Sequence, residues 1–113
     1  MAMDTRVRLQ TLLNNLEQEL QQLNWWELHA PSLQALQSQQ PFCVDTLNFS
    51  QWLQWVFVPR MHAIISTNQP LPGQCAIHAM AEVVYRDQLG MVEGLLDCLK
   101  SIDAAISTPH TLH

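Results

Sequence analysis

Four side chains that could do chemistry lie close together in the sequence: Cys43, Asp45, Arg60 and His62. A cysteine acts as a nucleophile when a neighbouring base accepts its proton, so a thiol beside a carboxylate and an imidazole could form a small active site. Nothing in the sequence brings these groups together in space, and Asp45 has an alternative role in the turn before Asn48. We therefore predict no enzymatic activity. An enzyme that uses these four residues is the least favoured alternative.

Metal and cofactor sites need several ligands at regular spacings. His62 and His78 are isolated, and His110 and His113 lie near each other only at the end of the chain. The cysteines form no CxxC pair, and the glycines form no phosphate-binding loop. We therefore expect no metal and no cofactor, and we expect the thiols to be reduced and buried.

Tryptophan in a small domain is more often part of the core than of a site. Trp25 and Trp26 are adjacent, however, and neighbouring residues on a helix point about 100° apart, so the two rings cannot share one buried face. Trp55 and Val58 fall toward the polar side of their helix. Tryptophan and arginine dominate interface hot spots. The residues predicted to contact a protein partner or a second copy are Trp25, Trp26, Trp55, Val58, Pro59 and Arg60.

Two helices are predicted in the first third of the chain. The first covers residues 4–24, where leucines recur at spacings of three and four on an otherwise polar segment. These leucines are Leu9, Leu13, Leu16, Leu20 and Leu23. A short extra helix is predicted at residues 30–36, with Pro31 in its first turn.

The next helix is predicted to begin at Asn48. Gln51 follows three residues later, which is the spacing of a capping box. Pro59 lacks the N–H that would bond the Trp55 carbonyl, so we predict that the helix kinks there and that Val58 is pushed out of helical geometry.

Arg60 would share a face with Phe49 and Leu53 if this helix were straight. Two outcomes are open: the kink turns the arginine outward, or the arginine is partly buried against a carboxylate. The candidate carboxylates are Asp45, Glu82 and Asp87.

Two apolar stripes follow in the last third of the chain, with Gly90 between them. One helical wheel fits both stripes, so a single long helix is an alternative to the break that we favour near residues 87–90. The expected fold is all-α. It is a four-helix, up-down-like bundle with one proline-kinked helix and a short extra helix in the first connection. We expect one domain over residues 1–106 and a flexible tail over residues 107–113.

The composition limits the classes of partner. The chain has 113 residues, of which 13% are charged, and its net charge is −5. Direct binding to nucleic acid is not expected, because such proteins need a basic face and the five Lys and Arg residues are scattered. No apolar run reaches the length of a membrane span, and no signal peptide opens the chain, so we expect a cytoplasmic protein without membrane contact.

The centre of the chain contains a long motif: Pro41-Phe42, Asp45-Thr46, the run from Gln51 to Phe57, Pro59-Arg60-Met61 and Gln69-Pro70-Leu71-Pro72-Gly73. This motif resembles the YqcC-like family of small bacterial proteins. The resemblance implies an all-α bundle of about four helices and supplies no catalytic residues. It also implies an association, by gene neighbourhood, with a tRNA pseudouridine synthase. Our first hypothesis is a non-catalytic protein-interaction module, and the alternative is an accessory protein in tRNA modification.

Overall fold

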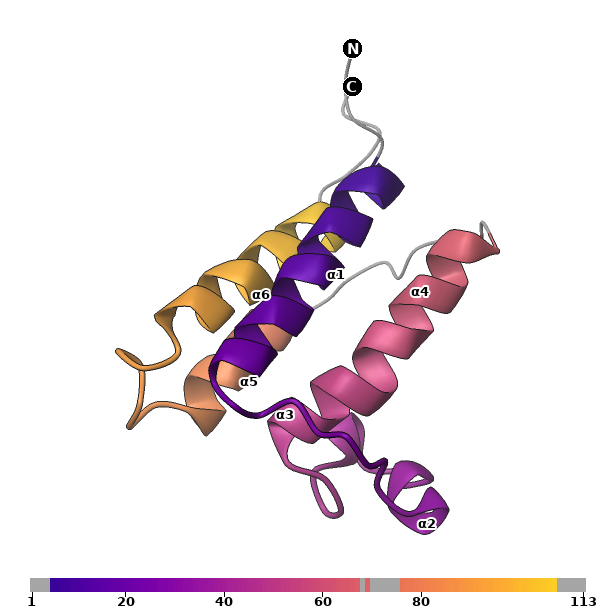
Figure 1. Cartoon of the computed structure of the whole chain (residues 1–113), viewed down its shortest axis with the longest axis vertical. Coiled ribbons are helices and arrows are strands. Elements are labelled where there is room, and N and C mark those ends of the chain that lie inside the picture. Colours follow the sequence, from indigo (N-terminus) through magenta and orange to yellow (C-terminus); the bar gives the residue numbers. More distant parts are fainter. Residues whose placement is uncertain (1–4, 68, 70–75, 108–113) are drawn as a thin grey trace.

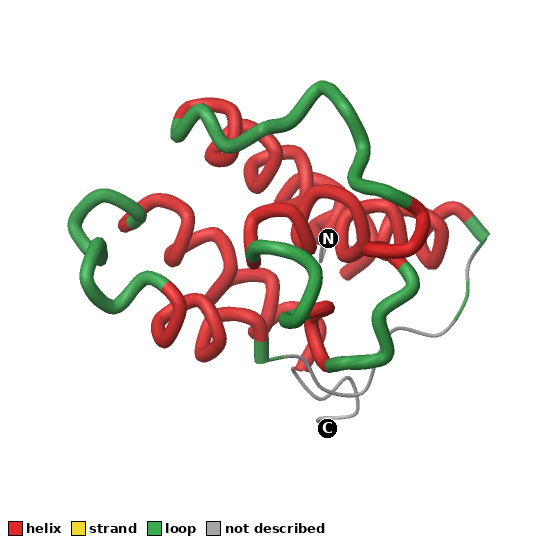
Figure 2. Tube along the Cα trace, turned by 90° about the horizontal axis from the view of Figure 1, so that it is seen from below, coloured by secondary structure: helices red, strands yellow, loops and turns green. Residues whose placement is uncertain are grey.

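The structure, a computed structural model, describes residues 5–67, 69 and 76–107. All regular secondary structure in these residues is helical, which confirms the all-α prediction (Figure 2). The elements are α1 (Thr5–Gln22), α2 (Leu33–Leu36), the 3-10 turn η1 (Pro41–Cys43), α3 (Phe49–Trp52), the π-helical turn η2 (Leu53–Phe57), α4 (Val58–Ser66), α5 (Ile77–Val84) and α6 (Glu93–Ser107). The structure therefore divides the chain more finely than the predicted helices do. Most of the predicted tail, residues 108–113, lies outside the described residues.

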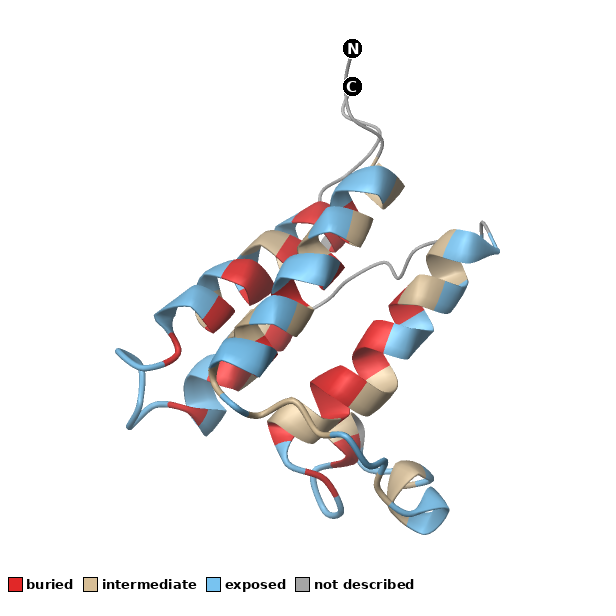
Figure 3. Ribbon diagram, viewed as in Figure 1, coloured by how far each residue is buried: buried red, intermediate tan, exposed pale blue. Residues whose placement is uncertain are grey.

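α1 and α6 lie side by side and form the main packed interface of the fold (Figure 1). The predicted leucine seam is confirmed for its first four members, Leu9, Leu13, Leu16 and Leu20, which are fully buried. The fifth, Leu23, follows the end of α1 and is partly buried. The fully buried residues that α6 contributes are Leu95, Leu99 and Ile102. Figure 3 shows that buried residues line the inward sides of the helices. Each buried leucine stabilises the fold by about 2 kcal/mol relative to an exposed one.

α3, η2 and α4 follow one another directly along the chain, and α4 packs against α1 (Figure 1). The predicted capping box opens this region. The Asn48 N–H donates to Gln51 Oε1 at 2.8 Å, and the Asn48 side chain accepts from the Gln51 N–H. His62 of α4 lies 3.4 Å from Glu17 of α1, which links the two helices by a polar contact.

The π-helical turn corrects the expectations that Val58 leaves helical geometry and that it faces the polar side of its helix. Val58 is helical, with φ −61° and ψ −49°, and its N–H bonds the Leu53 carbonyl, so the prediction of a non-helical Val58 is wrong. The extra residue of a π turn rotates everything that follows by about 100° relative to a regular helix. Val58 and Met61 therefore turn into the core, where they are 4% and 1% exposed, and Arg60 turns outward into solvent.

The last third of the chain forms two helices, α5 and α6, as we favoured, and residues 85–92 connect them. Asp103 of α6 fixes the start of α5, since its carboxylate accepts the N–H groups of Ile77 at 3.1 Å and His78 at 2.8 Å. These N–H groups lie in the first turn of α5 and have no partner within their own helix. None of the helices in the described part of the chain is both long and apolar enough to cross a membrane.

Candidate functional site

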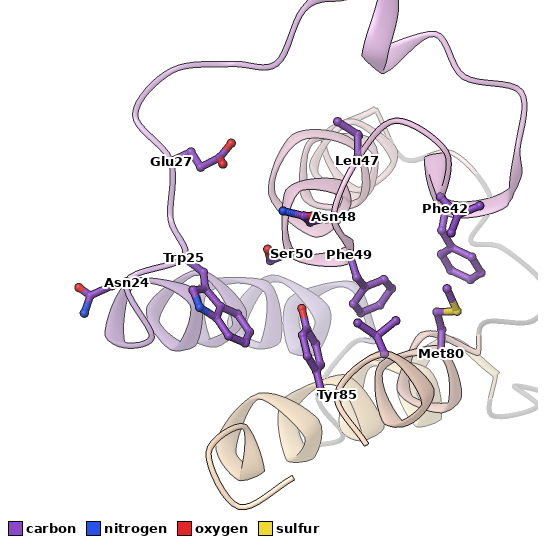
Figure 4. Close-up of a pocket in the computed structure, with 12 residues that line it drawn as sticks. Asn24, Trp25, Glu27, Phe42, Leu47, Asn48, Phe49, Ser50, Met80 and Tyr85 are labelled. Carbon is purple, nitrogen blue, oxygen red and sulfur yellow. The ribbon is translucent and has the colours of Figure 1, made fainter. Parts of the chain in front are cut away.

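A cavity of about 500 Å³ lies where three segments meet: the residues after α1, the residues from η1 to the start of α3, and α5 with the residue that follows it (Figure 4). We call this cavity the aromatic groove. Its aromatic lining residues are Trp25, Phe42, Phe49 and Tyr85, and its aliphatic ones are Val44, Leu47, Met80 and Val84. Its volume falls in the range of natural ligand sites, which are also mainly apolar with a few placed polar groups.

Three rings from three segments form one wall of the aromatic groove. Trp25 stacks on Tyr85 with ring centroids 5.1 Å apart and an angle of 26° between the planes. Phe49 meets Tyr85 edge-on, at 6.2 Å and 66°. Both arrangements are favourable for aromatic rings. The wall therefore depends on contacts between residues far apart in the sequence.

The end of α1 fixes the position of Trp25. Asn24 has a left-handed φ of 62°, its N–H bonds the Gln21 carbonyl at 3.0 Å, and the Trp25 N–H bonds the Leu20 carbonyl at 2.9 Å. This pair of bonds is a Schellman motif, in which asparagine takes the left-handed position that glycine more often fills. The motif ends the helix and directs Trp25 toward α5.

Phe42 occupies the opposite side of the aromatic groove from Trp25 (Figure 4). Its ring lies edge-on to Trp52 at 4.9 Å and to Phe49 at 5.9 Å. Phe42 and Cys43 both have left-handed φ values, 57° and 50°, which cost about 1 kcal/mol or more per residue outside glycine. The ring contacts of Phe42 and the burial of Cys43 offset this backbone strain.

Glu27 lies at the edge of the aromatic groove and is held by both its backbone and its side chain. Gln54, which is only 5% exposed, accepts the Glu27 N–H at 2.8 Å and donates to the Glu27 carbonyl at 2.7 Å. The Glu27 carboxylate accepts from Gln51 Nε2 at 3.1 Å and from Trp55 Nε1 at 3.2 Å. The extended segment after α1 is thereby attached to α3 and η2.

Tyr85 is the most buried polar side chain of the aromatic groove. Burial raises the pKa of its hydroxyl, and hydrogen bonding with Ser50 opposes part of that rise. The hydroxyl therefore stays protonated at neutral pH. Its hydrogen bond with Ser50 anchors the end of α5 to α3.

The structure separates the residues predicted to form an interaction surface. Trp25 lines the aromatic groove, and Trp26 packs against the core beside it. Trp55 is half-buried, with its indole N–H on Glu27. The list is wrong for Val58, which is buried by the π turn. The two remaining residues, Pro59 and Arg60, are exposed on α4 and do not line the groove.

The four residues of the enzyme alternative have different surroundings, and Arg60 is exposed on α4. Cys43 is buried as a free thiol, Asp45 bonds the Ser38 hydroxyl, and His62 faces Glu17. Within the described residues, no three His, Cys, Asp or Glu side chains are grouped closely enough to hold a metal ion.

Sequence reasoning missed most of the groove's lining. Tyr85 continues the stripe of Ile77 and Ala81 at a spacing of four, so its burial could have been predicted. Asn24, directly after a leucine-rich helix, was a signal for a left-handed cap. Phe42 and Glu27 carried no such signal, because only the folded chain brings them near α5.

Comparison with known proteins identifies relatives over most of the chain. The family model DUF446, described as tRNA pseudouridine synthase C, matches residues 8–105. The protein YqcC of Escherichia coli is 37% identical over 99 residues, which cover 88% of this chain and 89% of that protein. An uncharacterized protein of Haemophilus influenzae is 39% identical over 75 residues, which cover 66% of this chain and 71% of that protein.

Two further similarities concern the fold and a longer protein. The solution NMR structure of YqcC from E. coli matches with a TM-score of 0.85 at 32% identity, over 98% of this chain and 95% of that chain. A protein of Pectobacterium carotovorum named tRNA pseudouridine synthase C is 40% identical over 60 residues, which are 53% of this chain but only 16% of that protein. From the family match and the E. coli relative, the chain belongs to the DUF446 family of YqcC-like proteins.

Proposed function

We propose that this protein is a non-catalytic interaction module whose aromatic groove receives a segment of a protein partner, and that the partner is a tRNA pseudouridine synthase. The observation that carries the proposal is the groove itself: an open cavity of about 500 Å³ with aromatic walls. The proposal keeps Trp25 from the predicted contact surface and replaces its α4 residues, Val58, Pro59 and Arg60, with the groove beside α3.

The rim of the aromatic groove also favours a partner. Val44 and Val84 line the groove and are 60% and 42% exposed. Apolar surface that surrounds a cavity in this way is typical of interaction sites, since a partner's side chain removes it from water. Below the rim, Trp25 and Tyr85 belong to the residue types that contribute most to binding energy.

The relatives support the choice of partner. A segment similar to part of this chain forms a small part of a protein named tRNA pseudouridine synthase C. In that protein, one polypeptide therefore joins this segment to the rest of the synthase. Joining two modules raises their effective concentration to about the millimolar range, which allows even a weak contact to form. We propose that the same contact forms between separate chains here.

The proposal is tested by mixing the purified protein with the tRNA pseudouridine synthase C of the same organism and measuring the complex by gel filtration and calorimetry. We expect a complex with the wild-type chain. Val84→Asp should weaken it by about a hundredfold, because the change places a charge on the rim of the groove.

Val83→Asp is the matched control. Val83 precedes Val84 on α5, is 64% exposed and does not line the aromatic groove, so the same change there should leave binding within about threefold of wild type. Equal losses in the two variants would move the contact away from the groove. Absence of a complex with the wild-type chain would refute the synthase as partner.

A further inference from the structure

The two ends of the aromatic groove differ in chemistry. Figure 4 shows Glu27 at one end and Phe42 and Met80 at the other. Asn48 and Ser50 line the groove between them, while Phe49 continues the apolar end. An occupant that fills the whole groove therefore meets a carboxylate on one side and aromatic rings on the other.

Among the described residues, no cationic side chain pairs with the carboxylate of Glu27. Its hydrogen bonds come from the neutral donors Gln51 Nε2 and Trp55 Nε1. Neither of the ion pairs that the structure shows among the described residues involves Glu27. A partly buried carboxylate bound only by neutral donors gains further stabilisation from a cation, and charge-assisted hydrogen bonds are about twice as strong as neutral ones.

Glu27 is also held in place before any ligand arrives. The two hydrogen bonds of the buried Gln54 fix its backbone, and two side-chain donors fix its carboxylate. A charge held in this way loses little side-chain freedom on binding, so its attraction is available to the ligand.

We infer that the aromatic groove binds a partner segment in which a basic side chain lies next to an apolar or aromatic one. The cation pairs with Glu27, and the apolar side chain enters the end formed by Phe42, Phe49 and Met80. This inference rests on the proposed function and names the chemistry of the segment that the synthase presents.

Charge favours this occupant over two others. With a net charge of −5 and a carboxylate in the groove, the chain repels the phosphates of an RNA. A second copy of the chain carries the same net charge, so two copies repel each other as they approach. A basic segment is attracted by both the net charge and Glu27.

Three small probes test the inference without the synthase: phenylbutylguanidinium, neutral phenylbutanol and anionic phenylbutyrate. Binding is followed by NMR on the full chain, with the indole signal of Trp25 reporting the groove. We expect the guanidinium to bind about tenfold more tightly than the alcohol and the anion to bind most weakly. Glu27→Gln should bring the guanidinium and the alcohol to within about twofold of each other.

Glu93→Gln removes the same charge from an exposed position outside the groove and should keep the tenfold preference. Thermal unfolding of both variants checks that each is folded. Equal binding of the three probes, or tightest binding of phenylbutyrate, would overturn the inference. A wild-type dimer that Val84→Asp separates would also overturn it, because a second copy would then fill the groove.

These outcomes separate the inference from the proposed function. If the guanidinium is preferred but the synthase does not bind, the inference stands and the synthase is the wrong partner. If Val84→Asp abolishes synthase binding while the probes bind equally, the partner is right and the basic segment is wrong.

Discussion

The interface between α1 and α6 and the aromatic groove are both built mainly from apolar side chains, but they are closed in different ways. The helix interface repeats aliphatic residues at helical spacing, and the four leucines that α1 contributes to it are fully buried. The groove collects single residues from three segments and keeps a cavity of about 500 Å³. Single polar residues, among them Gln54 and Asn24, position its walls.

We infer from this difference that the helix interface serves stability and the aromatic groove serves binding. Close packing along the two long helices stabilises the fold, because every buried methylene contributes. The groove leaves apolar surface uncovered, which a folded chain tolerates only where the rest of its core is stable enough. We therefore expect substitutions in the first region to change stability and substitutions in the second to change binding.

The largest effect is expected for Leu16→Ala in α1. Leu16 is fully buried, and truncation of a buried leucine leaves a cavity, so the free energy of unfolding should fall by about 3 kcal/mol. Phe42→Ala in the wall of the groove should cost only about 1 kcal/mol, because that ring is half-buried and its left-handed backbone suits alanine no worse. Urea unfolding followed by circular dichroism measures both. A loss for Phe42→Ala as large as that for Leu16→Ala would show that the groove is part of the core.

A loss of stability smaller than that of Leu16→Ala is expected when the hydrogen bonds that hold Glu27 at the edge of the groove are removed. Gln54→Met keeps the side-chain volume but leaves the N–H and carbonyl of Glu27 without their partner, which should cost about 2 kcal/mol. Proteolysis within the extended segment after α1 should become faster, since the segment loses its two backbone hydrogen bonds to η2 and keeps only the one from Trp55. The control is Gln18→Met on the exposed side of α1, which should change stability by less than about 0.5 kcal/mol. Unchanged stability of Gln54→Met would mean that the ring of Trp25 and the side-chain hydrogen bonds of Glu27 hold this segment without Gln54.

The helix interface could be predicted from the sequence because each of its signals is local. The leucine spacing predicted residues 4–24, and α1 runs from Thr5 to Gln22. Asn48 and Gln51 predicted the start of α3, and their hydrogen bonds confirm it. Such patterns depend only on the 3.6-residue period of the helix and on capping chemistry.

The groove and the π turn could not be predicted in the same way. Trp25 and Tyr85 stack although sixty positions separate them, and no periodic pattern pairs such residues. The predicted positions of Val58 and Arg60 assumed a regular helix or a kink at Pro59. The structure has a π turn at Leu53–Phe57, which inserts one residue and rotates the residues that follow it. Val58 was therefore placed on the wrong face, while the outward alternative for Arg60 was correct.

The last prediction compares how the stability of the two regions depends on pH, and it has the smallest effect at neutral pH. It concerns Cys98 at the helix interface and Tyr85 in the groove. Burial, together with the negative charge of Glu19, raises the pKa of Cys98 from 9.0 to about 12. Burial also raises the pKa of Tyr85 from its usual 10.0. In both cases the unfolded chain loses its proton at a lower pH than the folded chain. The stabilisation is therefore complete below the unfolded pKa and is lost as the pH rises above it.

Cys98 should dominate this loss between about pH 8 and pH 10, because its unfolded pKa lies lower than that of Tyr85. We expect the free energy of unfolding of the wild type to fall by about 1 kcal/mol more than that of Cys98→Ala over this range. The free energy of unfolding of Tyr85→Phe should fall by about as much as that of the wild type. Urea unfolding at several pH values gives the slopes, and any cavity left by Cys98→Ala cancels because it does not depend on pH. If Tyr85→Phe removes the slope and Cys98→Ala does not, the groove would be the more pH-sensitive region. The thiol that donates to the Leu12 carbonyl would then be less protected than its burial implies.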